Sequence, residues 1–295
     1  MTTLLLFAIL PLLLSQELRP IYNIAHMVNS KEQVSEFMEK GANAIEFDVQ
    51  FYDNGTAYRT YHGIPCDCFR ICTKSAEIED YFDYIRNLTI SGGKYYGKLL
   101  LLMLDLKSSD VSIDNKLSAG ADIASKLMDH LWINVPFNEA VNIYLSIGHV
   151  TDKDVLRGAV QAIQQRDAKY LDRIGFDVGL GDSLEDIRDM YRELNISGHR
   201  WLGDGDTNCY SFLLPTTRLE AAIADRKANN ATSFVDKVYF WTTDSKTTIR
   251  KVLRLGVDGI ITNHPEYLSA IIEEEEFKKT LRLASTQDNP FMRIP

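Results

Sequence analysis

Strand-like and helix-like segments alternate along almost the whole of this chain of 295 residues. Eight times, a short run rich in apolar residues is followed by an amphipathic segment with helical spacing. This alternation is typical of a parallel sheet, in which each strand is joined to the next by a crossing helix. Eight such units predict a closed (β/α)8 (TIM) barrel of the α/β class, folded as a single domain.

The predicted segments can be placed by residue number. The strands are expected at 21–26, 44–51, 98–106, 141–147, 171–177, 198–202, 237–242 and 258–262. The helices are expected at 30–40, 75–88, 113–132, 152–168, 183–194, 217–229, 246–255 and 265–276. A turn at Asp53-Asn54-Gly55 predicts that 57–62 folds back on the second strand as an inserted hairpin strand. We expect the barrel to comprise 16–280 and 281–295 to form a C-terminal tail.

The N-terminus predicts export. Residues 4–14 form an apolar run that is too short to span a bilayer, and polar residues follow small Ser15 at once. We interpret 1–15 as a signal peptide and expect a secreted, extracellular protein without a transmembrane anchor. A net charge of −9 without a basic run argues against nucleic acid and strongly anionic membranes as partners. A zwitterionic lipid remains open as a substrate, and we expect a monomer.

The four cysteines favour the same compartment, because disulfides persist outside the cytosol. A bridge between Cys66 and Cys68 would be strained. That leaves Cys66–Cys72 with Cys68–Cys209, or the reverse choice. A zinc site made of the same residues is the rival interpretation, and it is less favoured in an exported protein. Triplets that permit glycosylation begin at Asn54, Asn87, Asn195 and Asn230.

Carboxylates lie within the second predicted strand and at the end of the third. Glu46 and Asp48 are two residues apart on a strand and therefore project from the same face. Asp105 closes a long apolar run, where a lone charge is difficult to bury. Three carboxylates at one barrel mouth favour Mg²⁺, because this ion prefers oxygen ligands. The plain alternatives are a solvated strand face for Glu46 and Asp48 and an ion pair between Asp105 and Lys107.

Other polar and aromatic residues fall at the same predicted mouth. His26 and His62 each end a strand, and a histidine pair beside a metal can act as acid and base near neutral pH. Lys107 can bind a phosphate oxygen. Tyr239 and Trp241 share a strand face and could hold a quaternary ammonium group, or they could be core residues. Together these residues favour metal-assisted phosphodiester chemistry; Asp244 and Asn263 lie close by.

Several stretches carry a resemblance to a known family. They are 25–29 (AHMVN), 41–49 (GANAIEFDV), 61–68 (YHGIPCDC), 105–107 (DLK), 197–201 (SGHRW), 206–209 (DTNC), 237–242 (KVYFWT) and 256–263 (GVDGIITN). In this order they resemble the sphingomyelinase D/dermonecrotic toxin family of arachnid phospholipases D, which is related to glycerophosphodiester phosphodiesterases. The tail stretch 284–291 (ASTQDNPF) resembles a motif that plugs the base of the barrel in that family, with Phe291 where tryptophan is usual.

The resemblance implies a specific function. It implies that choline or ethanolamine is removed from sphingomyelin-like and lysophospholipid substrates by attack of the substrate's own hydroxyl group, which leaves a cyclic phosphate. It implies that the catalytic pair is His26 and His62. It implies one Mg²⁺ ion on Glu46, Asp48 and Asp105. It implies a substrate site of Lys107, Tyr239, Trp241, Asp244 and Asn263. It implies the disulfides Cys66–Cys72 and Cys68–Cys209.

Two alternatives to this function are kept. One is a hydrolytic glycerophosphodiester phosphodiesterase on the same barrel, and the other is a secreted lipid-binding protein without activity. Phe47 lies between two predicted metal ligands, where the family commonly has small or polar residues. We expect its side chain to point away from the metal, into the packing between sheet and helices.

Overall fold

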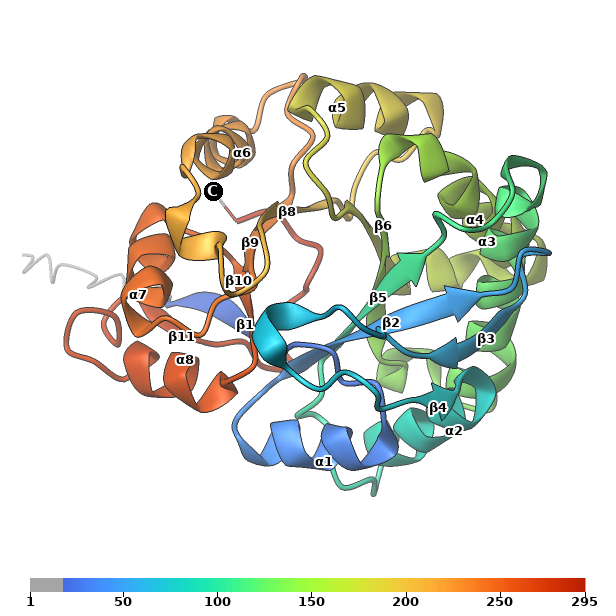
Figure 1. Ribbon diagram of the computed structural model, residues 1–295, viewed down its shortest axis with the longest axis horizontal. Helices are drawn as coiled ribbons and strands as arrows, with labels where there is room; N and C mark the ends of the chain where they lie inside the picture. The colour runs from blue at the N-terminus through green and yellow to red at the C-terminus, as the bar shows by residue number, and fades with distance from the viewer. Residues whose placement is uncertain (1–17, 295) are drawn as a thin grey trace, which may run out of the picture.

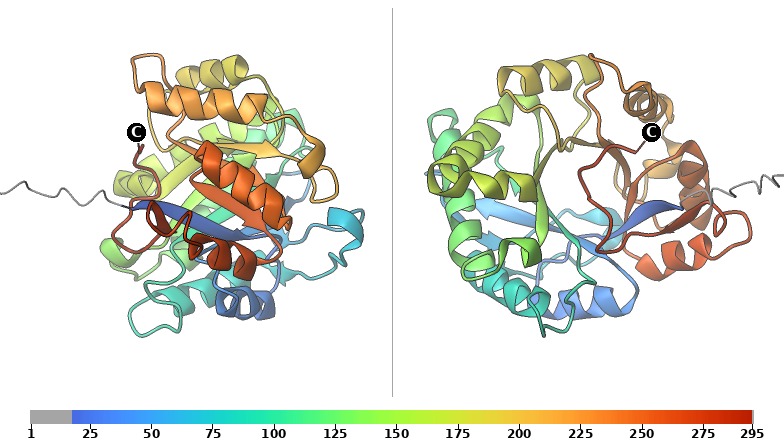
Figure 2. Two further views of the ribbon diagram at one scale, coloured as in Figure 1. Left: turned by 90° about the vertical axis from the view of Figure 1, so that its left-hand side faces the viewer. Right: turned by 180° about the vertical axis from the view of Figure 1, so that it is seen from behind.

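Parallel strands curl into a nearly closed eight-stranded barrel, and helices cover its outside (Figures 1 and 2). The computed structural model describes residues 18–294, so the predicted signal peptide lies outside the described residues. The predicted (β/α)8 fold is therefore confirmed. No helix between residues 18 and 294 combines the length and apolar character that a membrane crossing requires.

The barrel strands follow one another in a single order around the axis. That order is β7-β6-β5-β2-β1-β10-β9-β8. Their bounds are β1 Arg19–Ala25, β2 Ala44–Phe51, β5 Leu101–Lys107, β6 Asn142–Ile147, β7 Ile174–Val178, β8 Trp201–Gly205, β9 Lys237–Trp241 and β10 Gly259–Thr262. The helices are α1 Lys31–Glu39, α2 Ile78–Thr89, α3 Lys116–Lys126, α4 Lys153–Asp167, α5 Leu184–Glu193, α6 Thr217–Ala228, α7 Lys246–Leu255 and α8 Pro265–Ile272.

The barrel is weakest where β7 meets β8. The two strands share one isolated parallel bridge, between Phe176 and Arg200, and the Phe176 amide donates to the carbonyl of His199 at 2.8 Å. In every other neighbouring pair of barrel strands, at least two consecutive residues of one strand pair in register with the other strand. The ring of strands is therefore continuous, but β7 and β8 are joined by little backbone pairing.

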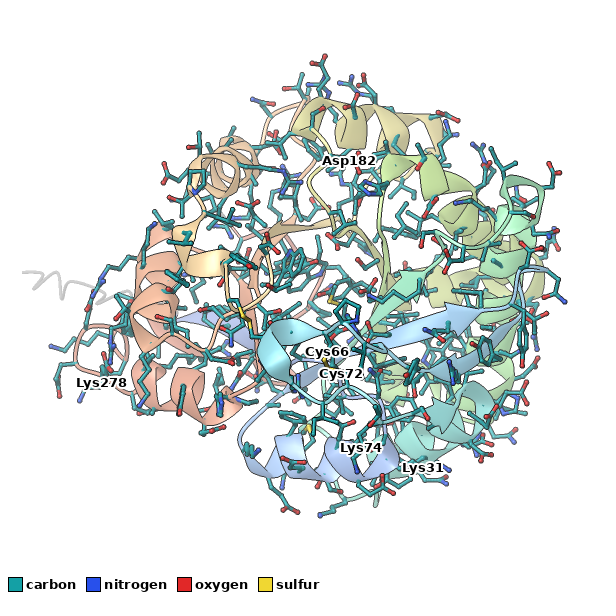
Figure 3. The ribbon with its side chains drawn as sticks, in the orientation of Figure 1. Lys31, Cys66, Cys72, Lys74, Asp182 and Lys278 are labelled. Carbon is teal, nitrogen blue, oxygen red and sulfur yellow. A yellow bond between two sulfur atoms is a disulfide. The ribbon has the colours of Figure 1, made fainter. Side chains whose placement is uncertain are left out.

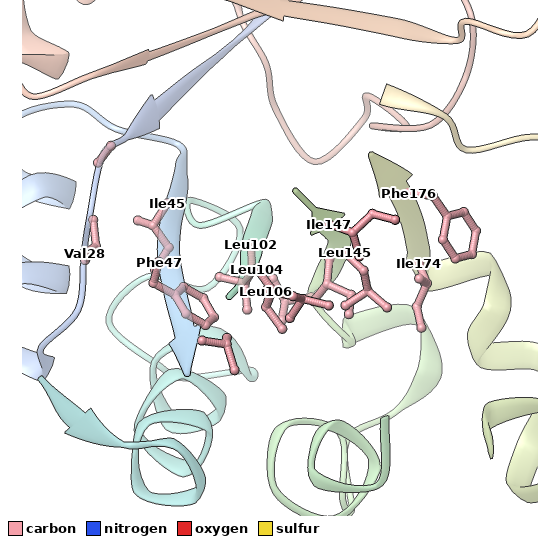
Figure 4. Close-up of a cluster of buried hydrophobic side chains, with 14 of the residues drawn as sticks. Val28, Ile45, Phe47, Leu102, Leu104, Leu106, Leu145, Ile147, Ile174 and Phe176 are labelled. Atoms are coloured by element: carbon pink, nitrogen blue, oxygen red, sulfur yellow. The ribbon is translucent and has the colours of Figure 1, made fainter. Parts of the chain in front are cut away.

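The outer face of the barrel strands forms the main core. Figure 4 shows Ile45, Phe47, Leu102 and Leu104 side by side between the strands and the covering helices. Phe47 is fully buried, and its ring meets that of Tyr81 on α2 edge-on, with centroids 5.0 Å apart. The expectation that Phe47 points away from the carboxylates is confirmed.

A second, smaller core fills the inside of the barrel. It is built around aromatic rings, since Tyr144 stacks on Trp201 with centroids 5.2 Å apart and Tyr22 meets Trp201 edge-on. Phe291 from the C-terminal tail belongs to this inner cluster and stacks on His199 at 4.6 Å. The tail is attached through β11 (Leu281–Leu283), which pairs in parallel with β1.

The predicted hairpin is present, but its second strand ends at Thr60 and not at the predicted residue 62. Strand β3 (Ala57–Thr60) pairs antiparallel with β2, and β4 (Ala76–Glu77) adds a further antiparallel strand to β3. The sequence pattern missed β4 because two residues carry no periodicity. Strand β3 lies beside β2 and pairs with its last residues, Val49 to Phe51 (Figure 1).

Several predicted boundaries were wrong, and three of these differences have a visible physical reason. Residues 168–173 form a 3₁₀ helix instead of opening β7. The strand predicted at 198–202 begins at Trp201, because His199 adopts a left-handed backbone with φ 63°. The last helix ends at Ile272, so the run of glutamates lies beyond it. There, Glu274 and Glu276 pair with Arg250 and Arg254 of α7.

Candidate active site

A cavity of about 460 Å³ opens at the carboxyl ends of the barrel strands. Its lining brings together residues from strands and loops far apart in the sequence, including His26, Glu46, His62, Asp105, Lys107 and Trp241. Parallel strands all end at the same rim of a barrel, which is why these positions converge. Ser146, Tyr239 and Thr242 also line this cavity.

The three predicted metal ligands lie together in this cavity. Each of Glu46, Asp48 and Asp105 offers a carboxylate oxygen, and these atoms all lie within 4.8 Å of one another. Asp48 on β2 is in register with Asp105 on β5, which explains their closeness. Glu46 and Asp48 are buried, and the Asp105 side chain is 30% exposed. A small divalent cation with oxygen ligands fits this set of donors.

Hydrogen bonds from the loop after β1 orient two of the carboxylates. The Met27 amide donates to Oε2 of Glu46 at 2.7 Å. The side chain of Asn29 donates to Oδ2 of Asp48 at 2.6 Å and accepts from the Asp48 amide at 2.9 Å. Such outer partners fix the direction of ligand oxygens. The sequence analysis missed Asn29, although it follows His26 by only three residues.

Lys107 contacts the same acidic cluster. Its Nζ lies 2.9 Å from Oδ1 of Asp48 and 2.6 Å from Oδ2 of Asp105. The ion pair considered from the sequence is therefore present, and it extends to Asp48. Burial alone would lower the pKa of Lys107, but Asp105 and Asp48 raise it above its ordinary value. One ammonium beside three carboxyl groups leaves an excess of acidic groups.

The pKa values of the two buried carboxyl groups, Glu46 and Asp48, are shifted in opposite directions. Burial, and then the charges of Asp48 and Asp105, raise the pKa of Glu46 well above its ordinary value. Burial also opposes ionisation of Asp48, but Lys107, His62 and the Asn29 amide hold the pKa of Asp48 below its ordinary value. Burial acts on both groups in the same direction, so the contrast arises because Asp48 has cationic and amide partners, whereas Glu46 lies beside two further carboxylates. A bound divalent cation would favour the charged form of Glu46 and offset this repulsion.

The two histidines border the cavity from different segments. His26 follows β1, and its Nδ1 lies 3.1 Å from Oδ1 of Asn263 and 3.6 Å from Oδ2 of Asp67. Its Nε2 lies 3.4 Å from the hydroxyl of Thr242. His62 follows β3, and its Nδ1 lies 3.2 Å from the carbonyl of Gly63. His26 is thus held by side chains, and His62 by its own loop.

Asp67 and Arg70 form a polar network behind His26 that the sequence analysis did not assign. Asp67 is buried and accepts from the Asn263 side chain at 2.7 Å. Burial opposes its ionisation, but hydrogen bonding and charge from His26 lower the pKa of Asp67 to about 2. Arg70 donates to the carbonyl of His26 at 3.1 Å and to Asn263. The position of Asp67 between two cysteines of the loop after His62 was the available signal.

The predicted substrate residues fall into two groups. Tyr239, Trp241 and Lys107 line the cavity. Asp244 and Asn263 lie behind His26, where Asp244 Oδ2 accepts from the Asn263 side chain at 2.9 Å. The amide of Asn263 and the hydroxyl of Thr262 also donate to Asp244, at 2.8 and 2.9 Å. In this structure Asp244 and Asn263 therefore contact the network around His26.

Asp177 is a further buried carboxyl group, beneath Tyr239. The Tyr239 hydroxyl donates to its Oδ2 at 2.7 Å, and the Ser146 hydroxyl donates to the same oxygen at 2.8 Å. Burial raises the pKa of Asp177 to about 6, although these hydrogen bonds lower it. The Tyr239 hydroxyl is thereby fixed, with its ring against the cavity.

Both disulfides have the pairing that the resemblance implied. Cys66 is bonded to Cys72 and Cys68 to Cys209, so the zinc alternative is wrong. Figure 3 shows Cys66 and Cys72 in the loop in front of the barrel. The second bridge joins this loop to the one after β8, across 141 residues of sequence.

Two solved structures with a similar fold are described as phosphodiesterases. A putative glycerophosphoryl diester phosphodiesterase from Silicibacter pomeroyi gives a TM-score of 0.57 at 14% identity, covering 90% of this chain and 96% of that one. A phosphodiesterase from Oleispira antarctica, in complex with sn-glycerol-3-phosphate, gives 0.54 at 13% identity, with coverages of 87% and 98%. At these identities the likeness establishes the barrel fold.

Sequence comparisons establish the family. The family model described as dermonecrotic toxin SPH matches residues 16–291. A dermonecrotic toxin SPH from Ixodes scapularis is 53% identical over 279 residues, covering 94% of this chain and 77% of the relative. A dermonecrotic toxin from Sicarius terrosus is 43% identical over 278 residues, with coverages of 92% and 98%. The chain therefore belongs to the dermonecrotic toxin family, whose members are phospholipase D enzymes.

Proposed function

We propose that this chain is a secreted, Mg²⁺-dependent phospholipase D of the sphingomyelinase D type. It removes choline or ethanolamine from sphingomyelin-like and lysophospholipid substrates and leaves a cyclic phosphate. The observation that carries this proposal is one cavity lined by two histidines and by three carboxylates whose oxygens lie within 4.8 Å of one another.

The residues of the cavity fit the roles that this reaction needs. Glu46, Asp48 and Asp105 would hold the ion, which would supply positive charge for the phosphate oxygens. Lys107 lies beside them and can bind another phosphate oxygen. The rings of Tyr239 and Trp241 border the same space and can contact the methylated or primary ammonium of a headgroup.

The proposed reaction needs one base and one acid. The substrate's own hydroxyl oxygen forms a bond to phosphorus, and the bond from phosphorus to the headgroup oxygen breaks. One histidine of the pair His26 and His62 accepts the hydroxyl proton, and the other gives a proton to the departing alcohol. The product is a cyclic phosphate, and no water is consumed.

Export is part of the proposal. The apolar N-terminal segment has the character of a signal peptide, and both disulfides suit an oxidising compartment. The relatives named above are toxins. Mass spectrometry of the N-terminus of protein recovered from the medium of expressing eukaryotic cells tests this part of the proposal.

The reaction itself is tested by ³¹P NMR of sphingomyelin during digestion. The proposal expects a cyclic phosphate signal from the first time points, its suppression by EDTA, and its recovery when Mg²⁺ is added. His26→Asn and His62→Asn should each abolish the signal while leaving the circular dichroism spectrum unchanged. A linear phosphomonoester from the outset would contradict the cyclising reaction.

Assays on other substrates and a lipid-binding measurement separate the two alternatives. The fold likeness to glycerophosphodiester phosphodiesterases favours the hydrolytic alternative, which predicts activity on deacylated glycerophosphodiesters alone. An inactive lipid-binding protein predicts that wild type and His26→Asn are equally inert and bind lipid equally. A panel of choline and ethanolamine sphingolipids and lysolipids then defines the headgroup preference.

A further inference from the structure

Two loops beside the cavity expose large apolar side chains to solvent. The first runs from 63 to 72, where Ile64 is 76% and Ile71 81% exposed. The second runs from 206 to 215, where Tyr210, Phe212 and Leu213 are 61%, 59% and 68% exposed. We call the six residues Ile64, Pro65, Ile71, Tyr210, Phe212 and Leu213 the apolar collar. Contiguous exposed apolar side chains mark interaction surfaces on soluble proteins.

The collar adjoins the mouth of the cavity. Pro65 is both a member of the collar and part of the cavity lining, and Thr207 of the second loop also lines the cavity. In Figure 2 (left) the two loops, cyan and gold, project from the same side of the barrel. This is the side at which the strands end and the carboxylates lie. A partner that covers the collar therefore also covers the entrance to the site.

The two loops are joined to each other and to the site. The Cys68–Cys209 bridge connects them covalently, and Cys66–Cys72 closes the first loop on itself. The Asn208 amide donates to Oδ1 of Asp67 at 2.7 Å, and Asp67 contacts His26 on its other side. A rigid surface loses little conformational freedom when it binds, which favours docking.

The charge of the collar indicates which surface it fits. Among the side chains that the structure describes in 63–72 and 206–215, every one that is exposed belongs to an apolar or aromatic residue. Arg70, the one cation of these loops, is half-buried and bonded to Asn263 and the His26 carbonyl. The collar thus lacks the basic residues that recognise anionic membranes or nucleic acid.

We propose that the apolar collar inserts into the surface of a zwitterionic phospholipid bilayer and holds the cavity mouth against the headgroups. The choice of a lipid surface rests on the proposed function, because a bilayer both covers the collar and presents headgroups to the cavity. A second copy of the chain on the collar would close the cavity mouth that the substrate has to enter. The proposed docking relies on apolar contacts, so binding to vesicles should change little with ionic strength.

The test measures binding separately from catalysis. Phe212→Ser/Leu213→Ser is made in a His62→Asn background, with EDTA present, and its co-flotation with phosphatidylcholine vesicles is measured. The matched control is Tyr96→Ser/Ile133→Ser, which removes two exposed apolar side chains from loops that lead into the N-terminal ends of β5 and β6. We expect the collar variant to partition at least about tenfold less than its parent, since two large apolar groups are lost, and the control to stay within about twofold.

A second experiment compares the activity of the collar variant on monomeric and on vesicle substrates. In the otherwise wild-type chain, Phe212→Ser/Leu213→Ser should release headgroups from a monomeric lysophospholipid within about twofold of wild type, and from vesicles at least about tenfold more slowly. Equal partitioning of parent and collar variant would overturn the proposal. So would equal losses in the collar and control variants, binding that disappears in salt, or a dimer that the collar variant dissociates. Failure of the proposed function would instead be seen as no headgroup release from any substrate, with vesicle binding intact.

Discussion

At the scale of single residues, Asp67 is the carboxylate among the side chains that hold His26. It is buried, lies 3.6 Å from the His26 ring, and has its pKa lowered to about 2 by hydrogen bonding and charge from His26, against the effect of burial. A carboxylate behind a catalytic histidine orients the ring and stabilises its protonated form. Asp67 is therefore a positioning residue for the proposed reaction.

Asp67→Asn should reduce kcat at least about tenfold and leave KM within about threefold, because the amide keeps the shape but not the charge. Steady-state kinetics on a soluble lysophospholipid measures both, and circular dichroism checks the fold. The control is Asp110→Asn, which makes the same substitution at an exposed residue in the loop after β5. An unchanged kcat in Asp67→Asn would contradict the positioning role.

Asp177 makes a pH-dependent contribution to stability. Its pKa is raised to about 6 in the folded chain by burial, so the folded state binds a proton that the unfolded state has lost. Stability from this group is therefore present below its unfolded pKa and is lost as pH rises toward about 6. Relative to Asp177→Asn, wild type should lose about 3 kcal/mol of unfolding free energy between about pH 4 and about pH 7.

Urea unfolding of wild type and Asp177→Asn at several pH values measures this difference. Other titrating groups affect both proteins alike, so the difference isolates Asp177. A difference that does not vary with pH would show that the carboxyl ionises normally despite its burial.

The sequence predicted those site residues that a local pattern along the chain identifies. Glu46 and Asp48 follow from strand alternation, and Asp105 from a charge that closes an apolar run. Asn29, Asp67 and Asp177 were missed because their roles depend on contacts through space. Asp177 is the clearest example, since it acts on Tyr239, which lies 62 residues away in the sequence.

At the scale of elements, helices α3 and α4 pack through facing glycines. A Cβ added to Gly120 would lie 1.8 Å from the Val155 carbonyl oxygen, and one added to Gly158 would lie 1.9 Å from that of Leu117. Glycine here permits backbone contact between the two helices, although it is a weak helix former. The amphipathic patterns of 113–132 and 152–168 predicted both helices but could not predict how closely they approach.

Gly158→Ala should therefore destabilise the protein by about 1–3 kcal/mol, because the crowding outweighs the gain in helix propensity. Urea denaturation measures the change. Gly181→Ala is the matched control, since a Cβ there meets nothing within 4 Å, and its effect should stay within about 0.5 kcal/mol. A stabilised Gly158→Ala variant would contradict the close packing.

The boundaries of long central strands were predicted unevenly, since β5 begins at Leu101 and not at the predicted residue 98. The bounds of β2 match the prediction at both ends. Strand β8 begins three residues later than the predicted 198, since Gly198 and His199 form the turn that brings Arg200 to Phe176. Tail strand β11 was missed because three residues beside β1 have no pattern of their own.

At the scale of the whole molecule, the Cys68–Cys209 bridge links distant parts of the barrel. It joins loops separated by 141 residues, whereas Cys66–Cys72 spans 6. In the loop-entropy account, closing a longer loop restricts the unfolded chain more. Cys68→Ser/Cys209→Ser should therefore lower the unfolding free energy by about 2–5 kcal/mol.

Urea unfolding of Cys68→Ser/Cys209→Ser and of Cys66→Ser/Cys72→Ser compares the two bridges. The loss from the long-range bridge should exceed that from the short one. The reverse order would show that local geometry of the 66–72 loop, and not chain restriction, dominates.

A shared ion on Glu46, Asp48 and Asp105 would depend on the whole barrel, because β2 and β5 must meet to bring the three carboxylates together. Calorimetric titration of Mg²⁺ into chelator-treated protein tests it most directly. We expect wild type and Asp110→Asn each to bind one equivalent of Mg²⁺, and Asp105→Asn to bind it at least about tenfold more weakly. Absence of saturable binding, or equal affinities in wild type and Asp105→Asn, would contradict the metal site.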